Sequence, residues 1–486
     1  MRQSKPTAIA PTMTRAGSGR APRVPAVIVP RFEIHGKWAP PGEREASGKM
    51  LRDAVPRESH AGWRAPRKRR DPVDIIIQSN VGRMAELVPI RHGRMLQSAF
   101  AFLRGSAAVM AADLATTPTT GIRVQACGDC HLLNFGGFAT PERNLFFDIN
   151  DFDETLPAPW EWDLKRLCAS LVVAGRHIAL KEREAENTAR AAAASYREHM
   201  REYARMRVLD VWYERVDAAK VLPTLPPEAR ERLMARIEKV RHRTVAEHDF
   251  PKLAEETGGS PRIRDNPPLI FHHPLQHGAG ADAWRNDLLE KYRRSLQEDR
   301  RVLLDQYRFC DAAIKVVGVG SVGTMCAVLL FMGADNDPLF LQMKEARPSV
   351  LEPYAGASLH ANAGERVVSG QRLMQAASDI FLGWTTGGRE GRHYYFRQLR
   401  DMKLSAMIET MDAKTLKTYG NLCGRVLARA HARNGSAASI AGYLGSTDAF
   451  DEAVTEFAAD YANQTELDHR AFATAIRDGR LQAMLQ

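Results

Sequence analysis

The residues with the clearest chemical potential lie between positions 127 and 166, in the stretch CGDCHLLNFGGFATPERNLFFDINDFDETLPAPWEWDLKR. Asp129 precedes Asn134 by five residues, and an acidic D-F-D follows a short apolar run. In phosphoryl transfer one carboxylate orients the acceptor hydroxyl, while an amide and a second carboxylate hold magnesium. We therefore expect Asp129 to act as the catalytic base and Asn134 and Asp151 to bind Mg²⁺ beside ATP, with Asp153 as a further metal contact.

Two other interpretations of this stretch are a polar turn with solvated acids and a different metal site. A calcium-binding loop starting at Asp148 would need glycine at its sixth position and glutamate at its twelfth, where Asp153 and Pro159 stand. Cys127 and Cys130 form a single C-x-x-C pair, without the second pair of a zinc site or the surroundings of a redox site. We interpret Cys127 as a small buried residue that ends a strand.

A glycine-rich segment far downstream carries Gly318, Gly320 and Gly323 in the spacing G-x-G-x-x-G. Dinucleotide-binding folds and kinases both use this spacing, because glycines let backbone amides approach phosphate oxygens. A dinucleotide fold requires a helix directly afterwards, whereas TMCAVLLFMG has the composition of a strand and runs into the turn signal A-D-N-D-P. The next strand carries Lys344, so we expect a hairpin that covers the ATP phosphates and a lysine that binds them. A dinucleotide fold and a hairpin without a ligand are the alternatives.

Two supporting positions follow from these motifs. Lys344 needs an acidic or polar partner on a nearby helix, and Glu352, Glu365 and Gln371 are candidates between which the sequence does not choose. Asp163 is expected to cap a helix and to anchor the catalytic segment through backbone amides, although a plain N-cap is the same physics without a functional role.

The composition is that of a globular protein. Of the 486 residues, 44% are hydrophobic, and no apolar run approaches the ~18–20 residues of a membrane helix, so we expect no membrane partner. The six cysteines are irregularly spaced and indicate no disulfide framework, which predicts a reducing, cytoplasmic setting.

The net charge is +10, and much of the excess lies in residues 1–72, where no acid precedes Glu33. This part is rich in proline, glycine and arginine and ends in the basic run at 67–70. We interpret it as a solvated leader that is largely disordered at its start. A transit peptide and an arm that touches nucleic acid are alternatives, and we consider nucleic acid an unlikely partner.

Composition shifts divide the rest of the chain. Apolar spacing predicts helices over 90–115, broken at Gly105, and over 364–384, while 393–403 is typical of a strand and its exit. The expected parts are a helical lobe with the catalytic loop and metal motif at 73–308, a small β lobe with the glycine loop and the lysine at 309–403, and C-terminal helices that complete the helical lobe at 404–486.

The segments GDCHLLNFG, DFD and WDL resemble the series H-G-D-x-H-x-x-N, I-D-[FW]-[DE] and D-L of aminoglycoside-phosphotransferase-like and other protein-kinase-like enzymes. From roughly residue 45 onward the chain also resembles a large bacterial family of unknown function grouped with that fold, in CGDCHLLNFG, FDINDFDETLPAPWEWDLKRL, GQRLMQAASDIFLGW and YGNLCGRVLARAHAR. The resemblance implies Asp129 as base, Asn134 and Asp151 as magnesium ligands, Lys344 as the phosphate lysine, and Gly318, Gly320 and Gly323 as the loop over the phosphates.

The order of the parts departs from that series. In kinase-like enzymes the glycine loop and lysine precede the catalytic loop, whereas here they follow it by about 190 residues. We therefore expect a circular permutation, whose new termini fall between the VLARAHAR helix and residue 120. Cys127 also replaces the usual histidine, which changes the hydrogen bonding of the loop.

These observations predict a helix-rich α+β protein with a two-lobed, circularly permuted, protein-kinase-like fold. The expected function is ATP- and magnesium-dependent phosphoryl transfer to the hydroxyl of an unknown, small-molecule acceptor. Protein phosphorylation and nucleotidyl transfer are alternatives on the same fold, and a non-catalytic nucleotide-binding protein is the alternative from another class.

Overall fold

The computed structural model describes residues 39–241, 249–257, 260–272, 281–388, 391–399 and 404–485. Its helices are α1 (Pro41–Ala54), α2 (Pro72–Ser79), α3 (Val88–Leu96), α4 (Ala99–Gly105), α5 (Ala107–Leu114), α6 (Trp160–His177), α7 (Glu182–Tyr203), α8 (Val208–Tyr213), α9 (Ala218–Val221), α10 (Pro227–Arg241), α11 (Phe250–Leu253), α12 (Ala281–Ser295), α13 (Glu298–Leu304), α14 (Glu352–Ala355), α15 (Ala363–Met374), α16 (Ala413–Asn434), α17 (Ala437–Leu444) and α18 (Ala449–Arg477). Its strands are β1 (Arg123–Ala126), β2 (Phe135–Ala139), β3 (Leu145–Ile149), β4 (Leu156–Pro159), β5 (Val216–Asp217), β6 (Ala254–Thr257), β7 (Ser260–Ile263), β8 (Ile270–Phe271), β9 (Arg308–Lys315), β10 (Cys326–Met332), β11 (Pro338–Ala346), β12 (Gly383–Gly387), β13 (Arg392–Gln398) and β14 (Leu404–Ser405). The prediction of a helix-rich α+β protein is confirmed.

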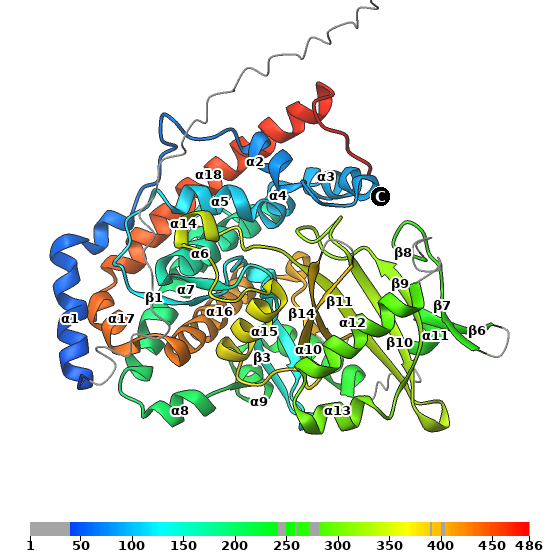
Figure 1. Ribbon diagram of the computed structural model, residues 1–486. Coiled ribbons are helices and arrows are strands. Elements are labelled where there is room, and N and C mark those ends of the chain that lie inside the picture. The colour runs from blue at the N-terminus through cyan, green and yellow to red at the C-terminus, as the bar shows by residue number, and fades with distance from the viewer. Residues whose placement is uncertain are drawn as a thin grey trace, which may run out of the picture. The chain divides into compact units, whose positions relative to one another are not determined.

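A helical core is built from α6, α7, α16 and α18 (Figure 1). On α7 the small residues Ala185, Ala189, Ala192 and Ala193 are buried at helical spacing, so the neighbouring helices approach closely. Gly424 of α16 lies so near the Ala192 carbonyl that an added Cβ would collide with it. The α6 helix is buried along almost its whole length and runs through the centre of this core.

A six-stranded sheet forms the other main part and lies on the right in Figure 1. Its strand order is β12-β13-β11-β10-β9-β8, and every pairing is antiparallel. The α12 helix packs on one face, where the Tyr292 ring stacks on Phe396 at 4.0 Å between centroids and its hydroxyl donates to the Phe381 carbonyl. The α15 helix contacts β11, β12 and β13 and connects the sheet to the helical core.

Smaller sheets accompany these two parts. The four-stranded sheet has the order β14-β2-β3-β5, and β1 pairs with β4. The β2–β3 hairpin returns the chain to the end of the catalytic segment, because the Asn150 amide donates to the Asn134 carbonyl at 2.9 Å. The D-F-D motif therefore starts next to the residue that the D-x-x-x-x-N spacing singled out.

Several boundaries differ from the predictions. The helix expected over 90–115 is three helices, and the one expected over 364–384 ends at Met374, before β12 begins. The start of the basic leader, and residues 400–403 of the expected strand, lie outside the described residues. The later part of the basic leader packs on the folded body: it includes α1, and Arg69 of the basic run forms ion pairs with Asp113 and Asp468 and is mostly buried.

Two further sequence expectations concern cysteines and membranes. All six cysteines are unpaired, which agrees with the absence of a disulfide framework. Among the described helices, none combines the length and the apolar character that crossing a bilayer requires.

The ion pair between Asp148 of β3 and Arg429 of α16 is almost completely buried, with each side chain 1% exposed. We expect Arg429→Met to lower the free energy of unfolding by about 3–5 kcal/mol, because it leaves the Asp148 carboxylate buried without its cation. The exposed Arg190, which pairs with Glu452, is the control: Arg190→Met should cost less than about 1 kcal/mol. Urea denaturation measures the stability of both variants. Equal losses of stability would contradict the assignment of Asp148 and Arg429 as a stabilising buried ion pair.

Candidate functional site

Lys344 and the acidic D-F-D motif meet, although they are 191 residues apart in the chain. The Lys344 Nζ donates to Asp153 Oδ2 at 2.6 Å and lies 3.8 Å from Asp151 Oδ1. The lysine is only 2% exposed, and burial alone would lower its pKa, but the two carboxylates raise the pKa well above its ordinary value. The ammonium is therefore charged and shared between two aspartates.

The register of the six-stranded sheet brings further polar side chains to the same place. Lys344 on β11 stands opposite Tyr395 on β13, and Gln342 stands opposite Arg397. Because positions two apart on a strand share a face, these four side chains are neighbours. The Tyr395 hydroxyl donates to Asp153 Oδ1 at 2.5 Å, and the Arg397 Nε donates to Gln342 Oε1 at 2.9 Å.

Asp129 is held by one buried arginine and by its own loop. Arg166 Nε donates to Asp129 Oδ1 at 2.6 Å, and this arginine is 1% exposed. The Asn134 side-chain amide donates to the Asp129 carbonyl at 2.7 Å, which occupies its nitrogen and leaves its oxygen as the atom that a metal would take. The buried His131 Nε2 lies 3.9 Å from Asp129 Oδ2, and burial lowers the pKa of this histidine to about 3, so it is neutral.

Asp163 anchors the catalytic segment, as expected, although it does so from the first turn of α6, whose N-cap is Pro159. Its two carboxylate oxygens accept the backbone amides of Cys127 (2.6 Å) and Gly128 (2.9 Å). His431 Nε2 of α16 lies 3.2 Å from the same carboxylate. The core helices α6 and α16 thus hold the start of the loop in place.

The residue that replaces the usual histidine also has a partner. Cys127 is fully buried directly after β1, and its thiol donates to the Asp151 carbonyl at 3.3 Å. Gly128 adopts a φ of 86°, and an added Cβ there would collide with the Glu154 carbonyl. The catalytic loop and the D-F-D segment are consequently in direct contact.

The glycine-rich segment is a loop between β9 and β10 rather than part of a strand. Gly318 and Gly323 have φ values of 64° and 87°, in the region that favours glycine. The Ser321 hydroxyl donates to Asp153 Oδ2 at 3.2 Å, so the loop reaches the acidic motif. Gly323 is held away from the aspartates, because its carbonyl accepts the Met84 amide at 2.7 Å.

Two adjoining cavities surround these groups. One, of about 420 Å³, is bordered by Asp129, Asn134, Asp151, Asp153, Gly318 and Gly320. The other, of about 710 Å³, is bordered by Lys344 with Gln342, Gln371 and Arg397. Asn150, Asp151, Gly318 and Ser321 border both, so the cavities meet at Asp151. All the predicted site residues except Gly323 border one cavity or both.

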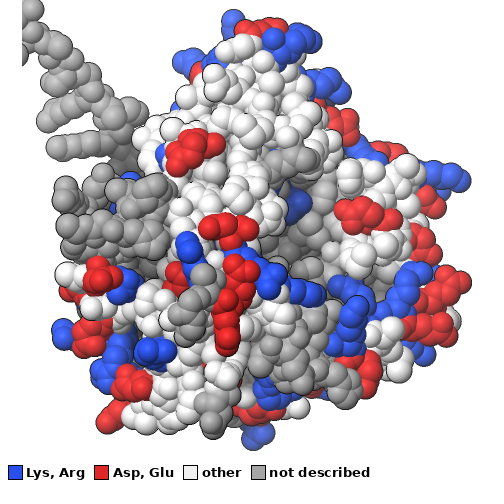
Figure 2. Space-filling view, turned by 90° about the vertical axis from the view of Figure 1, so that its right-hand side faces the viewer, with Lys and Arg blue, Asp and Glu red and all other residues white. Residues whose placement is uncertain are grey.

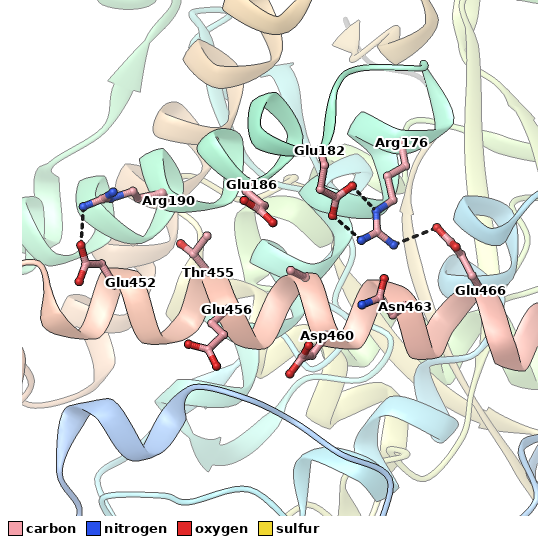
Figure 3. A pocket seen from close by; sticks show the side chains of 11 residues that line it. Arg176, Glu182, Glu186, Arg190, Glu452, Thr455, Glu456, Asp460, Asn463 and Glu466 are labelled. Atoms are coloured by element: carbon pink, nitrogen blue, oxygen red, sulfur yellow. Dashed lines mark hydrogen bonds and ion pairs between the residues drawn. The ribbon is translucent and has the colours of Figure 1, made fainter.

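A larger pocket, of about 1030 Å³, lies elsewhere. It is an open groove where side chains of α18 face those of α6 and α7 (Figure 3). Arg176 binds Glu182 and Glu466, and Arg190 binds Glu452. None of the predicted site residues borders this groove, so its size does not make it the candidate site.

The sequence did not identify every contact of the site. The partner of Lys344, which the sequence left undecided, is not on a helix. Of the candidates, Glu352 accepts the Ser349 amide, and the Glu365 Oε1 lies 3.4 Å from His360 Nδ1. Arg166 and Tyr395 were missed. The signal for Arg166 was its position one helical turn after Asp163, and the signal for Tyr395 was its alternation with Arg397 in the strand pattern.

The expected metal ligands are a carboxylate pair and an amide. Within the described residues, no three His, Cys, Asp or Glu side chains are grouped closely enough to hold a metal ion by themselves. Asn134, Asp151 and Asp153 border one cavity and offer only hard oxygen atoms, a donor set that suits magnesium when substrate phosphates and water complete its shell.

Glu154 gives the site a pH dependence. Burial raises the pKa of its carboxyl to about 7, although Arg366 opposes the shift. The folded protein therefore holds a proton that the unfolded chain releases near pH 4.5. The stability that this proton contributes is fully present at low pH and is lost as the pH rises through about 7.

We expect Glu154→Gln to flatten this decline in urea denaturation between about pH 5 and pH 8. Exposed Glu256→Gln should keep the wild-type slope, and so would Glu154→Gln if the assignment were wrong.

Comparisons with known proteins address the family of the chain. A family model described as "Uncharacterized protein conserved in bacteria (DUF2252)" matches residues 83–475. Neither curated proteins nor solved structures give a match. The matched range contains the catalytic segment, the D-F-D motif, the glycine-rich loop and Lys344, and it spans most of the chain. The protein therefore belongs to this bacterial family.

Proposed function

We propose that this protein is an ATP- and magnesium-dependent phosphotransferase with a two-lobed, protein-kinase-like fold. The observation that carries the proposal is the contact of the Lys344 ammonium with Asp153 and its proximity to Asp151. A strand lysine beside metal-binding aspartates is the arrangement with which kinases position the phosphates of ATP. In this chain the pairing joins two segments that are 191 residues apart, so no local structure brings them together.

The order of the parts supports a circular permutation. The glycine-rich loop joins β9 to β10 and the lysine lies on the next strand, as in kinases, but the catalytic loop comes earlier in the chain. Asn434, at the end of α16, accepts the Gln125 amide of β1 at 2.7 Å. Because β1 leads directly into the catalytic loop, connecting the end of α16 to β1 would restore the usual order.

The two cavities suggest a division of roles. The nucleotide would occupy the cavity of Lys344, with its phosphates directed toward Asp151, and the acceptor would occupy the cavity of Asp129. Bound magnesium would neutralise phosphate charge. Asp129, fixed by Arg166, is placed to orient the acceptor hydroxyl and to accept its proton. Lys344 would exchange its contact with Asp153 for phosphate oxygens.

Other functions use the same groups differently. Nucleotidyl transfer would result if ATP were bound in the reverse direction, and a protein could be the acceptor in place of a small molecule. A non-catalytic nucleotide-binding protein would be expected to lack the base or a metal ligand, yet both are present in one cavity. On the face that Figure 2 shows, acidic and basic side chains of the described residues are interspersed, which gives no support for a nucleic-acid surface there.

Nucleotide binding can be tested without knowing the acceptor. Mg-ATP at 100 times its dissociation constant should stabilise the protein by about 2.7 kcal/mol, because it binds only the folded state. We expect Lys344→Met and Asp151→Asn to lose most of the rise in melting temperature, while exposed Lys414→Met keeps it. Equal shifts in all four proteins would contradict the proposed nucleotide site.

Turnover separates a transferase from a scaffold. We expect Asp129→Asn to bind Mg-ATP with unchanged affinity and to reduce ATP consumption by about 10²–10⁴-fold, because proton acceptance is lost while positioning is kept. The assay is ADP release at saturating Mg-ATP, with Asp299→Asn on the exposed part of α13 as the matched control. Equal residual rates in wild type and Asp129→Asn would favour the scaffold, and AMP as the product would favour nucleotidyl transfer.

A further inference from the structure

Four arginines border the cavity of Asp129: Arg83, Arg91, Arg104 and Arg347. They come from different segments, namely the turn after α2, α3, α4 and the end of β11. None of them borders the cavity of Lys344. We call these four residues the arginine cluster. It was not among the predicted site residues, because its members are scattered over more than 260 positions of the sequence.

The arginine cluster is held in place by neutral groups. Arg83 donates to the carbonyls of Ser79 (3.0 Å) and Val322 (2.6 Å), and Arg347 donates to the carbonyls of Ser79 (3.5 Å) and Val81. Arg91 donates to Asn80 Oδ1 and to the Gly105 carbonyl, at 2.6 and 2.7 Å. Across the described residues, no carboxylate oxygen forms an ion pair with any of the four guanidinium groups.

The positive charges of the arginine cluster repel one another. Burial, and then the neighbouring Arg347, lower the pKa of Arg83 to about 10, although the nearby carboxylates of Glu154, Glu345 and Asp153 oppose the shift. Burial lowers the pKa of Arg91 well below its ordinary value, and Arg83 and Arg347 add to that effect. Charges that are crowded together and partly withdrawn from water are unfavourable unless an opposite charge joins them. An anion in this cavity would supply that charge.

Arg91 and Arg104 both have a buried Nε without a hydrogen-bond partner, and Arg104 lies beside the proposed base. The guanidinium carbon of Arg104 lies 5.7 Å from the centre of the Phe100 ring. It lies within electrostatic range of Asp129 but forms no ion pair with it. Arginine offers several donors in a planar arrangement that matches phosphate and carboxylate oxygens. Arg104 can therefore donate to a ligand that sits beside the proposed base.

We propose that the arginine cluster binds a phosphate or carboxylate group of the acceptor, so that the substrate of the proposed transfer is an anionic small molecule with a free hydroxyl. The assignment of the anion to an acceptor rests on the proposed function. The anion site itself does not depend on it. The phosphates of ATP are the other source of such an anion. The acceptor is favoured, because the cluster is confined to the cavity of Asp129 while Lys344 borders the other cavity.

Inorganic phosphate is the probe, titrated calorimetrically into the full chain without nucleotide. We expect saturable binding by the wild type and affinities about tenfold weaker for Arg104→Gln and for Arg83→Gln, because each loses a charge-assisted hydrogen bond to the anion. Exposed Arg205→Gln, in the turn after α7 and outside the cavity of Asp129, should keep the wild-type affinity. Thermal unfolding of each variant checks that the chain is folded.

A second titration identifies the source of the anion. Arg104→Gln should bind Mg-ATP with an affinity within about twofold of the wild type, and saturating Mg-ATP should leave phosphate binding intact. Parallel loss of phosphate and Mg-ATP affinity, or competition between them, would assign the cluster to the nucleotide and overturn the acceptor assignment. The inference also fails if the wild type binds no phosphate or if Arg104→Gln binds it as well as the wild type. Wild-type protein that binds phosphate but shows no rise in melting temperature with Mg-ATP would refute the nucleotide site and leave the anion site standing, so the two proposals can fail separately.

Discussion

The pairing of one buried ammonium with two carboxylates is the interaction on which the arrangement of the site depends. Lys344 is withdrawn from water on the third strand of its sheet, where an unpaired charge would be strongly unfavourable. Asp153 relieves that cost, and its oxygens also accept the hydroxyls of Tyr395 and Ser321. Three separate segments of the sheet region are thereby bound to one short acidic turn.

The backbone around this turn is fixed as firmly as its side chains. Arg366 of α15 donates to the carbonyls of Asp153 and Thr155, so the helix that contacts the sheet also holds the acidic segment. On the opposite side, Asp163 binds the amides that begin the catalytic loop. The proposed catalytic loop is held by helices and the acidic turn by the sheet and α15. The boundary between the two runs along the cavities.

The sequence predicted those features that rest on local composition. A helix-rich α+β fold and the anchoring of the segment around Asp129 by Asp163 follow from composition, spacing and turn chemistry. Register between strands is not a local property, so the position of Tyr395 opposite Lys344 could not be predicted. The helix expected to reach 384 ends at Met374, and the last two residues of the expected range, Gly383 and Trp384, pair with β13 as part of β12. The arginine cluster depends entirely on tertiary structure.

The position of β1 beside the end of α16 has a consequence for how the chain folds during its synthesis. A chain leaves the ribosome from its N-terminus, and domains generally fold in that order. The segment with Asp129, Asp151 and Asp153 therefore emerges long before Lys344 and before α16, whose His431 and Arg429 contact Asp163 and Asp148. Until translation is nearly finished, these carboxylates lack the partners that Lys344, Arg429 and His431 supply and must stay hydrated. Synthesis of α16 thus supplies the partners against which Asp148 and Asp163 become buried.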